Sequence, residues 1–457
     1  MEYVALKEPS ILKDCNKIAE FFDIDSLRKA LDDIYSNWID KKADTKLKNI
    51  LIPYCIFQTE DKLLKLKVQI EDWALNKRGA LAAHSVYAMA LNGSRFALVL
   101  VDTISVKIKN NQVKNAAKDA LKKAAKELEI SEDELIDKII PDLDFDKKGM
   151  RELNYGGEAQ RVFTLQIKND FSIEITDLAN KVLKSLPTAN SKDDKDQVDK
   201  AKKELTLIKK NIKMISSNQI IRLNKVLLNG RKWSYKTFNE LFVNNPIMNI
   251  FASKLIWGVY DENNNLLESF RYMDDGSFST FDEEEYIFND TLKTKKNITL
   301  IHPIELDNEK LLKWRTQLSD YEISQPINQL YLLFEEVKRE HIKDNKIISF
   351  EGREITAGNI MAMANKMSFE RSKNIEDGGS YTYYELKDSI LGIVCHINFD
   401  CMWFGISTDE KIIFNNITFH KLDENGNYNE EELINPLEIN KRFTSSIYKT
   451  VKSYFIN

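Results

Sequence analysis

The chain has 457 residues, a formal net charge of −5, and 43% hydrophobic and 30% charged residues. This composition excludes bulk disorder, because there is ample apolar surface to bury. The 15 Gly and 8 Pro exclude a collagen-like or low-complexity chain, and four Cys cannot form a disulfide framework. At roughly 150 residues per domain, the length corresponds to about three domains.

We expect neither a targeting segment nor a membrane segment. The N-terminus is acidic early and has no apolar stretch before Pro9, unlike a secretory signal. The most apolar run, residues 390–406, is interrupted by Asn398 and Asp400 and does not reach the length of a membrane helix. Together with the free thiols, this predicts a cytoplasmic protein with no membrane partner.

Residues 9–139 predict one helix after another. Ser10 is a candidate N-cap for a helix over 11–22, and a second helix is expected over 25–38. Further helices are expected to begin near Asp44, Glu60, Gly79 and Ser94, followed by helices over 111–128 and 131–140. Helix starts recur in pairs about 33 to 35 residues apart, which is typical of stacked helical hairpins. Residues 1–140 therefore predict a HEAT-like helical array.

The pattern changes after Pro141. Residues 162–167 and 171–175 alternate apolar and polar positions and predict a β-hairpin, which a charged connector follows. A long helix is expected over 194–229, because its apolar positions keep three-four spacing and Gly230 can end it. Beyond it we expect strands over 255–260, 266–272 and 286–288, and then helices over 308–320 and 327–341.

The last hundred residues predict both element types. A helix is expected over 358–367, strands over 380–386 and 391–405, and a closing helix over 439–455. The predicted fold is α+β, with an N-terminal α-helical hairpin array followed by a mixed α/β C-terminal region. The expected segments are the array (1–140), the hairpin and connector (141–190), the long basic helix with a small sheet and helices (191–345), and a C-terminal α+β domain (346–457).

Several short motifs, in the same order along the chain, resemble the MolR-like family. The resemblance begins at residues 116–144 and continues through 153–156, 184–187 and 189–193. It is strongest over 221–261, and it extends through 301–306, 320–326, 350–355 and 377–379. It implies an uncharacterised C-terminal domain behind helical repeats, and it implies no established catalytic residues. The chain departs from the family in lacking a WGR-type module and in having Phe369-Glu370-Arg371 near the place of a Trp-centred basic segment.

Two patterns that resemble metal sites are interpreted as structural. On a regular strand, Cys395 and Cys401 share one face and His396 lies on the other, which argues against a shared ion. The acidic run at 142–146 resembles the start of a calcium loop, but Lys147 and Leu153 stand where glycine and glutamate are required. With no phosphate-binding glycine motif either, the sequence predicts no metal and no cofactor.

No catalytic residue is assigned from the sequence. His302, which precedes Pro303 at the end of an apolar strand, is interpreted as orienting a loop through hydrogen bonds, because no partner for a general base is identifiable. An enzyme would require a polar cluster of His302, Arg353, Arg371 and Asp377 in one cleft. The alternative for these residues is salt-bridged support of a loop.

Residues 200–233 are the one strongly charged feature, with ten basic residues and a single acid, Glu204. The candidate nucleic-acid contacts are Lys202, Lys203, Lys209, Lys210, Lys213, Arg222, Lys225, Arg231 and Lys232. Lys202, Lys209 and Lys213 line one side of the expected helix and could bind phosphate backbones. The alternative is a solvated face that docks on the acidic run at 274–285 of the same chain.

The leading hypothesis is a non-enzymatic macromolecular interaction protein: a scaffold, regulator or interference factor that binds another protein or protein complex. Helical arrays expose extended concave surfaces that suit such binding. A nucleic-acid-binding protein that uses the basic helix is the alternative, and an uncharacterised enzyme is the second alternative.

Overall fold

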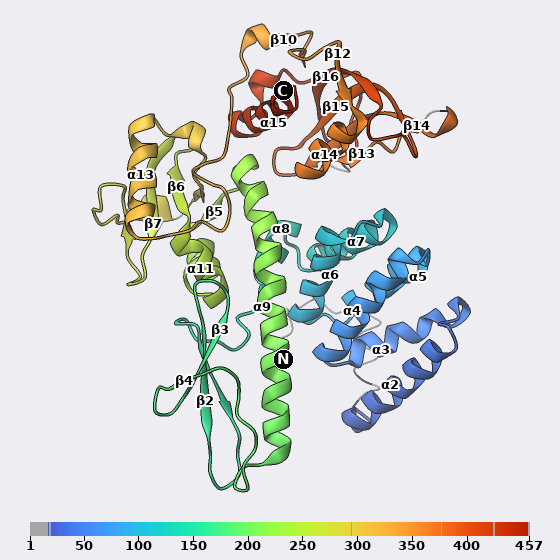
Figure 1. Ribbon diagram of the computed structural model, residues 1–457, viewed down its shortest axis with the longest axis vertical. Coiled ribbons are helices and arrows are strands. Elements are labelled where there is room, and N and C mark those ends of the chain that lie inside the picture. Colours follow the sequence, from blue (N-terminus) through green and yellow to red (C-terminus); the bar gives the residue numbers. More distant parts are fainter. Residues whose placement is uncertain (1–16, 18–19, 294, 376, 424–425, 456–457) are drawn as a thin grey trace. The chain divides into compact units, whose positions relative to one another are not determined.

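The computed structural model describes residues 17, 20–293, 295–375, 377–423 and 426–455 (Figure 1). The predicted helix over 11–22 lies almost entirely outside these residues. The chain forms two compact units, the first from residues 1–219 and 239–250 and the second from 220–238 and 251–457. The α+β class with N-terminal helices is confirmed.

Helices dominate the first unit. They are α2 (Ile24–Asp40), the 3₁₀ turn η1 (Thr45–Ile50), α3 (Leu51–Phe57), α4 (Glu60–Leu75), α5 (Gly79–Ala90), α6 (Arg95–Lys107), α7 (Asn111–Glu127) and α8 (Glu132–Ile139). Helix α5 packs on both α3 and α7, and helix α6 packs on both α4 and α8. This alternation gives two stacked layers, the arrangement of a helical-repeat array.

Local sequence explains where these helices begin. Asp23, Ser94 and Asn110 precede α2, α6 and α7, and each side chain accepts a hydrogen bond from a backbone N–H of the first turn. Ser131 and Glu134 form a capping box at the start of α8. Helix α6 is buried at ten successive positions, from Phe96 to Ser105, so it forms the centre of the array.

The predicted β-hairpin is part of a four-stranded antiparallel sheet in the first unit. Its strands follow chain order and are β1 (Met150–Asn154), β2 (Val162–Ile167), β3 (Ile173–Asp177) and β4 (Val182–Leu183). The inward positions of β2, including Phe163 and Leu165, are buried and the intervening ones are half-buried, which explains the alternation in the sequence.

Residues 155–161 and 187–193 meet beside this sheet. Tyr155 donates its hydroxyl hydrogen bond to the Pro187 carbonyl at 2.8 Å, and the Asp193 carboxylate accepts from Arg161 and from the Asn190 backbone. Gly157 has φ +68°, and a Cβ at this position would overlap the Lys192 carbonyl oxygen. The motif at 153–156 therefore has a structural role, closing the connector onto the sheet.

Helix α9 (Lys195–Asn229) matches the predicted helix to within one residue and contributes to both units. Within the first unit, its buried face includes Leu205, Ile208, Ile212 and Ile215. Gly230 follows with φ +69°, a conformation that ends a helix without strain only at glycine.

Four short elements follow α9 along the chain. They are β5 (Trp233–Ser234), α10 (Tyr235–Phe238), the π-helix η2 (Asn239–Val243) and α11 (Pro246–Lys254). The second unit then holds a five-stranded sheet in the order β5-β9-β6-β7-β8. Its other strands are β6 (Ile256–Tyr260), β7 (Leu266–Tyr272), β8 (Phe278–Ser279) and β9 (Lys296–Leu300), and its helices are α12 (Asp290–Lys293), η3 (Pro303–Glu305) and α13 (Asn308–Asp320).

The strand predicted over 286–288 is wrong. Among the described residues, its only sheet-like contacts are an isolated bridge between Ser279 and Glu285 and a hydrogen bond from the Tyr286 N–H to the Phe278 carbonyl at 2.7 Å, so it forms no strand. The rings of Tyr286 and Phe288 instead pack against Phe270, with centroids 5.6 and 5.2 Å away. Aromatic burial therefore produced the apolar pattern that suggested a strand.

The helix predicted over 327–341 is also wrong, since only its end is helical, as the 3₁₀ turn η4 (Arg339–His341). The fully buried Gln329 side chain accepts from the Ile256 N–H at 2.9 Å and donates to the carbonyls of Ile256 and Ile301. These bonds hold the segment along the sheet edge and replace helical ones.

The rest of the second unit is a seven-stranded antiparallel sheet with two packed helices. Its strands are β10 (Ile342–Lys343), β11 (Lys346–Ile347), β12 (Arg353–Thr356), β13 (Glu370–Arg371), β14 (Ser380–Asp388), β15 (Ile393–Trp403) and β16 (Lys411–Lys421). Its helices are α14 (Ala357–Lys366) and α15 (Lys441–Ser453), with 3₁₀ turns η5 (Asp377–Gly379) and η6 (Pro436–Glu438). Phe443, Ile447 and Val451 of α15 join the core that lies on one face of the sheet.

The expectation that Cys395 and Cys401 share a face is wrong. Cys395 and Phe399 belong to the core face, but the pairing of β15 with β14 is irregular between Asn398 and Met402, and Met402 rather than Cys401 returns to that face. Cys401 is therefore half-buried and lies outside the core cluster. In the described part of the chain, no helix is both long enough and apolar enough to cross a bilayer.

Candidate functional site

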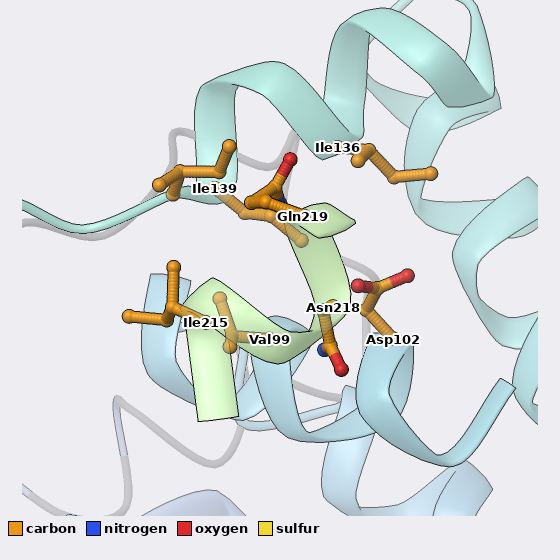
Figure 2. Close-up of a pocket in the computed structure, with 8 residues that line it drawn as sticks. Val99, Asp102, Ile136, Ile139, Ile215, Asn218 and Gln219 are labelled. Carbon is orange, nitrogen blue, oxygen red and sulfur yellow. The ribbon is translucent and has the colours of Figure 1, made fainter. Parts of the chain in front are cut away.

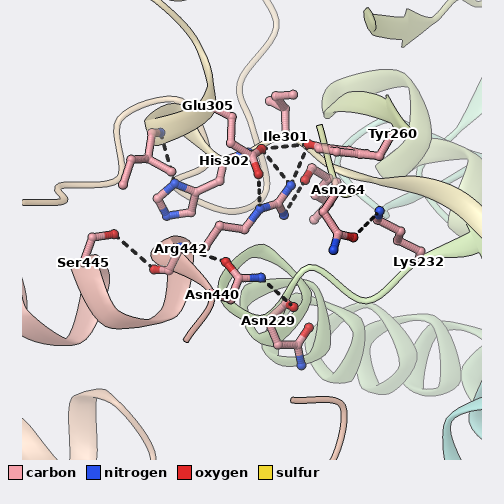
Figure 3. A network of polar contacts seen from close by, with 12 residues as sticks. Asn229, Lys232, Tyr260, Asn264, Ile301, His302, Glu305, Asn440, Arg442 and Ser445 are labelled. Atoms are coloured by element: carbon pink, nitrogen blue, oxygen red, sulfur yellow. Dashed lines mark hydrogen bonds and ion pairs between the residues drawn. The ribbon is translucent and has the colours of Figure 1, made fainter. Parts of the chain in front are cut away.

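A buried arginine forms the centre of the polar network in Figure 3, within the second unit. Arg442 of α15 has only 4% of its side chain exposed. Its Nε and Nη2 donate to the two carboxylate oxygens of Glu305 at 2.6 and 2.7 Å, and its Nη1 donates to the Leu300 carbonyl at 2.9 Å. Tyr260 accepts from Nη2 and donates to Glu305. The network therefore joins α15 to the five-stranded sheet.

His302 lies next to this network and is fully buried. Its Nδ1 accepts a hydrogen bond from the Ile304 N–H at 3.1 Å, so the neutral ring carries its proton on Nε2, 3.1 Å from Ser446 Oγ. Burial, and secondarily the Arg442 charge, lower the pKa of His302 to about 3. A neutral imidazole with both nitrogens engaged caps the η3 turn, as the sequence interpretation expected.

The other members of the predicted polar cluster have different neighbours. Arg353 donates to the Phe455 carbonyl at 2.8 Å and lies over the Phe455 ring. Arg371 stacks on Phe404, with its guanidinium carbon 4.0 Å from the ring centroid. The side chain of Asp377 lies outside the described part of the chain. Among the described contacts, His302, Arg353 and Arg371 do not touch one another, so the geometry gives no support to a shared catalytic cleft.

The exposed side of α9 carries a surface that we call the lysine stripe: Lys202, Lys203, Lys209, Lys210 and Lys213. Lys203, Lys209, Lys210 and Lys213 are exposed and Lys202 is half-buried. Within the described residues, none of the five has an ion-pair partner. Glu204, the single acid of this segment, pairs with Arg151 of β1. The stripe therefore presents positive charge that the described part of the first unit does not neutralise.

The remaining predicted nucleic-acid contacts belong to the second unit, unlike the stripe. Arg231 lies over the Trp233 ring at 5.1 Å. Lys232 donates to Asn264 at 2.7 Å and lies over the Tyr260 ring, and burial, followed by the Arg442 charge, lowers its pKa. Arg222 is half-buried and Lys225 is exposed. The nine predicted contacts are thus divided between two units, and only the five stripe lysines form a set.

A small cavity lies between α6, α8 and α9 in the first unit (Figure 2). Its volume is about 10 Å³, and Val99, Asp102, Ile139, Ile215 and Asn218 are among the residues that line it. Asn218 donates to Thr103 Oγ1 at 2.8 Å. A space of this size holds one water molecule at most, so it cannot accept an organic ligand.

Sequence reasoning missed a buried polar face on β14, β15 and β16. Tyr383, Glu385, His396, Thr418 and His420 are at most 7% exposed. The His396 ring stacks on Tyr383 at 4.2 Å and lies 4.6 Å from the His420 ring. Burial is the main cause that lowers the pKa of His396 to about 3, and its Nε2 has no hydrogen-bond partner within the described chain. The signal was the alternation of polar residues along 383–387 and 394–398.

This polar face is not a metal site in its present arrangement. Over the described residues, no three His, Cys, Asp or Glu side chains lie where they could together hold an ion. The acidic run at 142–146 forms a turn, in which Asp142 accepts from the Asp144 N–H and Asp146 accepts from the Lys148 and Met150 N–H groups.

One family model matches the central part of the chain. Residues 181–369 match the family model of a domain of unknown function, DUF4132. This range includes α9, the five-stranded sheet and Glu305 of the polar network.

A curated relative is the uncharacterized protein YehI of Escherichia coli (strain K12), which is 28% identical over 336 residues. The match covers 73% of this chain and 27% of YehI, so the chain spans about a quarter of the length of that relative. No solved structure matches the chain.

Proposed function

We propose that this chain is a non-enzymatic interaction module that binds another macromolecule, and that the lysine stripe of α9 is its binding surface. The observation that carries the proposal is a set of five lysines that have no acid partner among the described residues, on one side of a helix whose other side is fixed in a core. Holding cations close together without neutralising them costs stability, and a negatively charged partner compensates that cost.

The stripe is held on rigid structure. Leu205, Ile208 and Ile212 anchor α9 by burial, and the Arg151–Glu204 pair fixes the adjacent turn to the sheet. Such a surface is ordered before binding, which reduces the entropy that association costs. The helical array beside it supplies further surface for a scaffold or regulator, as in other helical-repeat proteins.

The alternative of an intramolecular acidic partner has weaker support. Within the acidic run at 274–285, Asp282 pairs with Lys313 at 3.0 Å, and Asp275 accepts from Ser277. The enzyme alternative has less support still, because His302 is a neutral cap and the known contacts of Arg353 and Arg371 lie elsewhere. A partner with dense negative charge fits the stripe best.

The test is affinity capture from the native host in buffers of increasing salt. The variant Lys203→Glu/Lys210→Glu/Lys213→Glu should lose the partner, and the captured material should be released by salt from the wild type. The matched control reverses three exposed lysines of the helical array, Lys29, Lys46 and Lys122, with the same change in net charge. Equal capture by wild type and the stripe variant would refute the proposal.

A further inference from the structure

A sixth cation extends the lysine stripe. Lys107, the last residue of α6, donates a hydrogen bond from Nζ to Ser217 Oγ at 2.8 Å. Ser217 lies one turn beyond Lys213 on α9, so this ammonium group continues the line of charge. Burial is the main cause that lowers the pKa of Lys107, and the nearby Lys67 charge is the next cause. The array therefore brings a cation to the stripe from a distant part of the sequence.

The extended surface has the length of a nucleic-acid contact. Lys202 and Ser217 are 15 residues apart, which corresponds to about 22 Å along the helix at 1.5 Å per residue. Duplex DNA carries one phosphate charge per about 1.7 Å of its axis, so a surface of this length faces several phosphates. Lysine binds phosphate as a flexible point charge and needs no fixed geometry.

The residue types distinguish a nucleic acid from an acidic protein. The stripe contains lysine and no arginine. The planar fork of arginine matches both carboxylates and phosphates, so the stripe suits a partner whose charge is bound without bidentate geometry. Protein interfaces are enriched in aromatic residues, methionine and arginine, whereas lysine is depleted there. Contacts to phosphate backbones, by contrast, regularly use lysine, together with arginine, polar side chains and backbone N–H groups.

The same residue types distinguish a duplex from a single strand. Proteins that hold single strands without sequence preference stack the bases on aromatic side chains. The 35 residues of α9 include no Phe, Tyr or Trp, so the stripe offers no ring for a base. The backbone of a duplex needs no such ring, since its bases are already stacked.

We infer that the lysine stripe with Lys107 binds the phosphate backbone of a nucleic-acid duplex without reading its sequence. The inference rests on the proposed function and names the partner of that surface. Base readout would require polar side chains that reach base edges, and the side chains of the stripe are point charges.

The test is the fluorescence anisotropy of a labelled 20-base-pair DNA duplex with the full chain, from 50 to 200 mM salt. Five to six phosphate contacts predict a slope of log K against log salt of about −4.5 to −5.4. The neutral variant Lys203→Gln/Lys210→Gln/Lys213→Gln should reduce the steepness by about 2.7, and Lys107→Gln alone by about 0.9. Circular dichroism confirms that each variant is folded, and the control is the glutamine variant of Lys29, Lys46 and Lys122.

Two comparisons complete the design. A duplex of unrelated sequence should bind within about twofold, and a single strand of the same length should bind more weakly. If the duplex does not bind but stripe-dependent capture from the host persists, the inference is overturned and the proposed function stands. If polyglutamate binds as tightly as the duplex with the same slope, an acidic protein replaces the nucleic acid as the partner. Loss of both duplex binding and capture refutes both proposals.

Discussion

Removing the carboxylate of Glu305 should destabilise the second unit far more than removing an exposed one. Glu305→Ala leaves the Arg442 guanidinium, 4% exposed, without its two charge-assisted hydrogen bonds. Breaking one side of such a buried pair costs about 3 to 5 kcal/mol, because a charge then remains buried and unpaired. Tyr260 also loses the acceptor of its hydroxyl hydrogen bond.

Hydrogen exchange measured by mass spectrometry reports this loss of stability segment by segment. In β9 and α15, exchange through opening of the unit should accelerate by roughly two to three and a half orders of magnitude, since about 1.4 kcal/mol is tenfold. The matched control is Glu354→Ala, which removes the exposed Lys411–Glu354 pair and should cost less than about 1 kcal/mol. Replacing both partners, Arg442→Met with Glu305→Leu, should recover much of the loss. Equal acceleration in the Glu305 and Glu354 variants would refute the reasoning.

Three further predictions concern stability. His302 and His396 both have a pKa near 3 in the fold and 6.5 when unfolded, so they contribute stability that is present above pH 6.5 and is lost as the pH falls toward 3, about 2 kcal/mol each at pH 5. In denaturant titrations, the free energy of unfolding of His396→Gln should fall less between pH 7.5 and pH 5 than that of the wild type. An equal fall would exclude His396 as a cause. Gly157→Ala should cost more than about 2 kcal/mol of stability, because a Cβ would overlap the Lys192 carbonyl. The control Gly149→Ala, with φ +72° and contacts no closer than 3.6 Å, should cost about 1 kcal/mol. Equal melting temperatures of the two variants would contradict this prediction. The stripe variant with three glutamates should keep the melting temperature of the wild type within a few degrees, because the stripe side chains have no ion-pair partners among the described residues, and a large drop would show that the stripe has a structural role.

Periodicity predicted the elements whose stability is mostly local. Helices α9 and α13 were found at or within one residue of their predicted bounds, because three-four spacing, N-caps and Gly230 all define them nearby in the sequence. The segment at 327–341 failed because one glutamine, Gln329, replaces helical hydrogen bonds with bonds to two distant residues. No local pattern contains that information.

In the candidate site, too, the features defined by local sequence could be predicted and those defined by distant contacts could not. The five stripe lysines could be predicted, since four- and seven-residue spacing places them on one side of a helix. Lys107 could not, because it comes from α6 and meets Ser217 only in the packed array. The Cys395 and Cys401 faces were predicted for a regular strand, and the irregular pairing of β15 with β14 between Asn398 and Met402 changed the outcome.

The most direct test of the central claim is lysine footprinting in host extract. The chain is acetylated with and without the extract, and the modification of each lysine is read by mass spectrometry. Bound partner should protect Lys203, Lys210 and Lys213, while the control lysines Lys29, Lys46 and Lys122 keep their reactivity, and raised salt should abolish the protection. Unchanged reactivity of the stripe, under conditions where a partner is captured, would contradict the claim that this surface binds it.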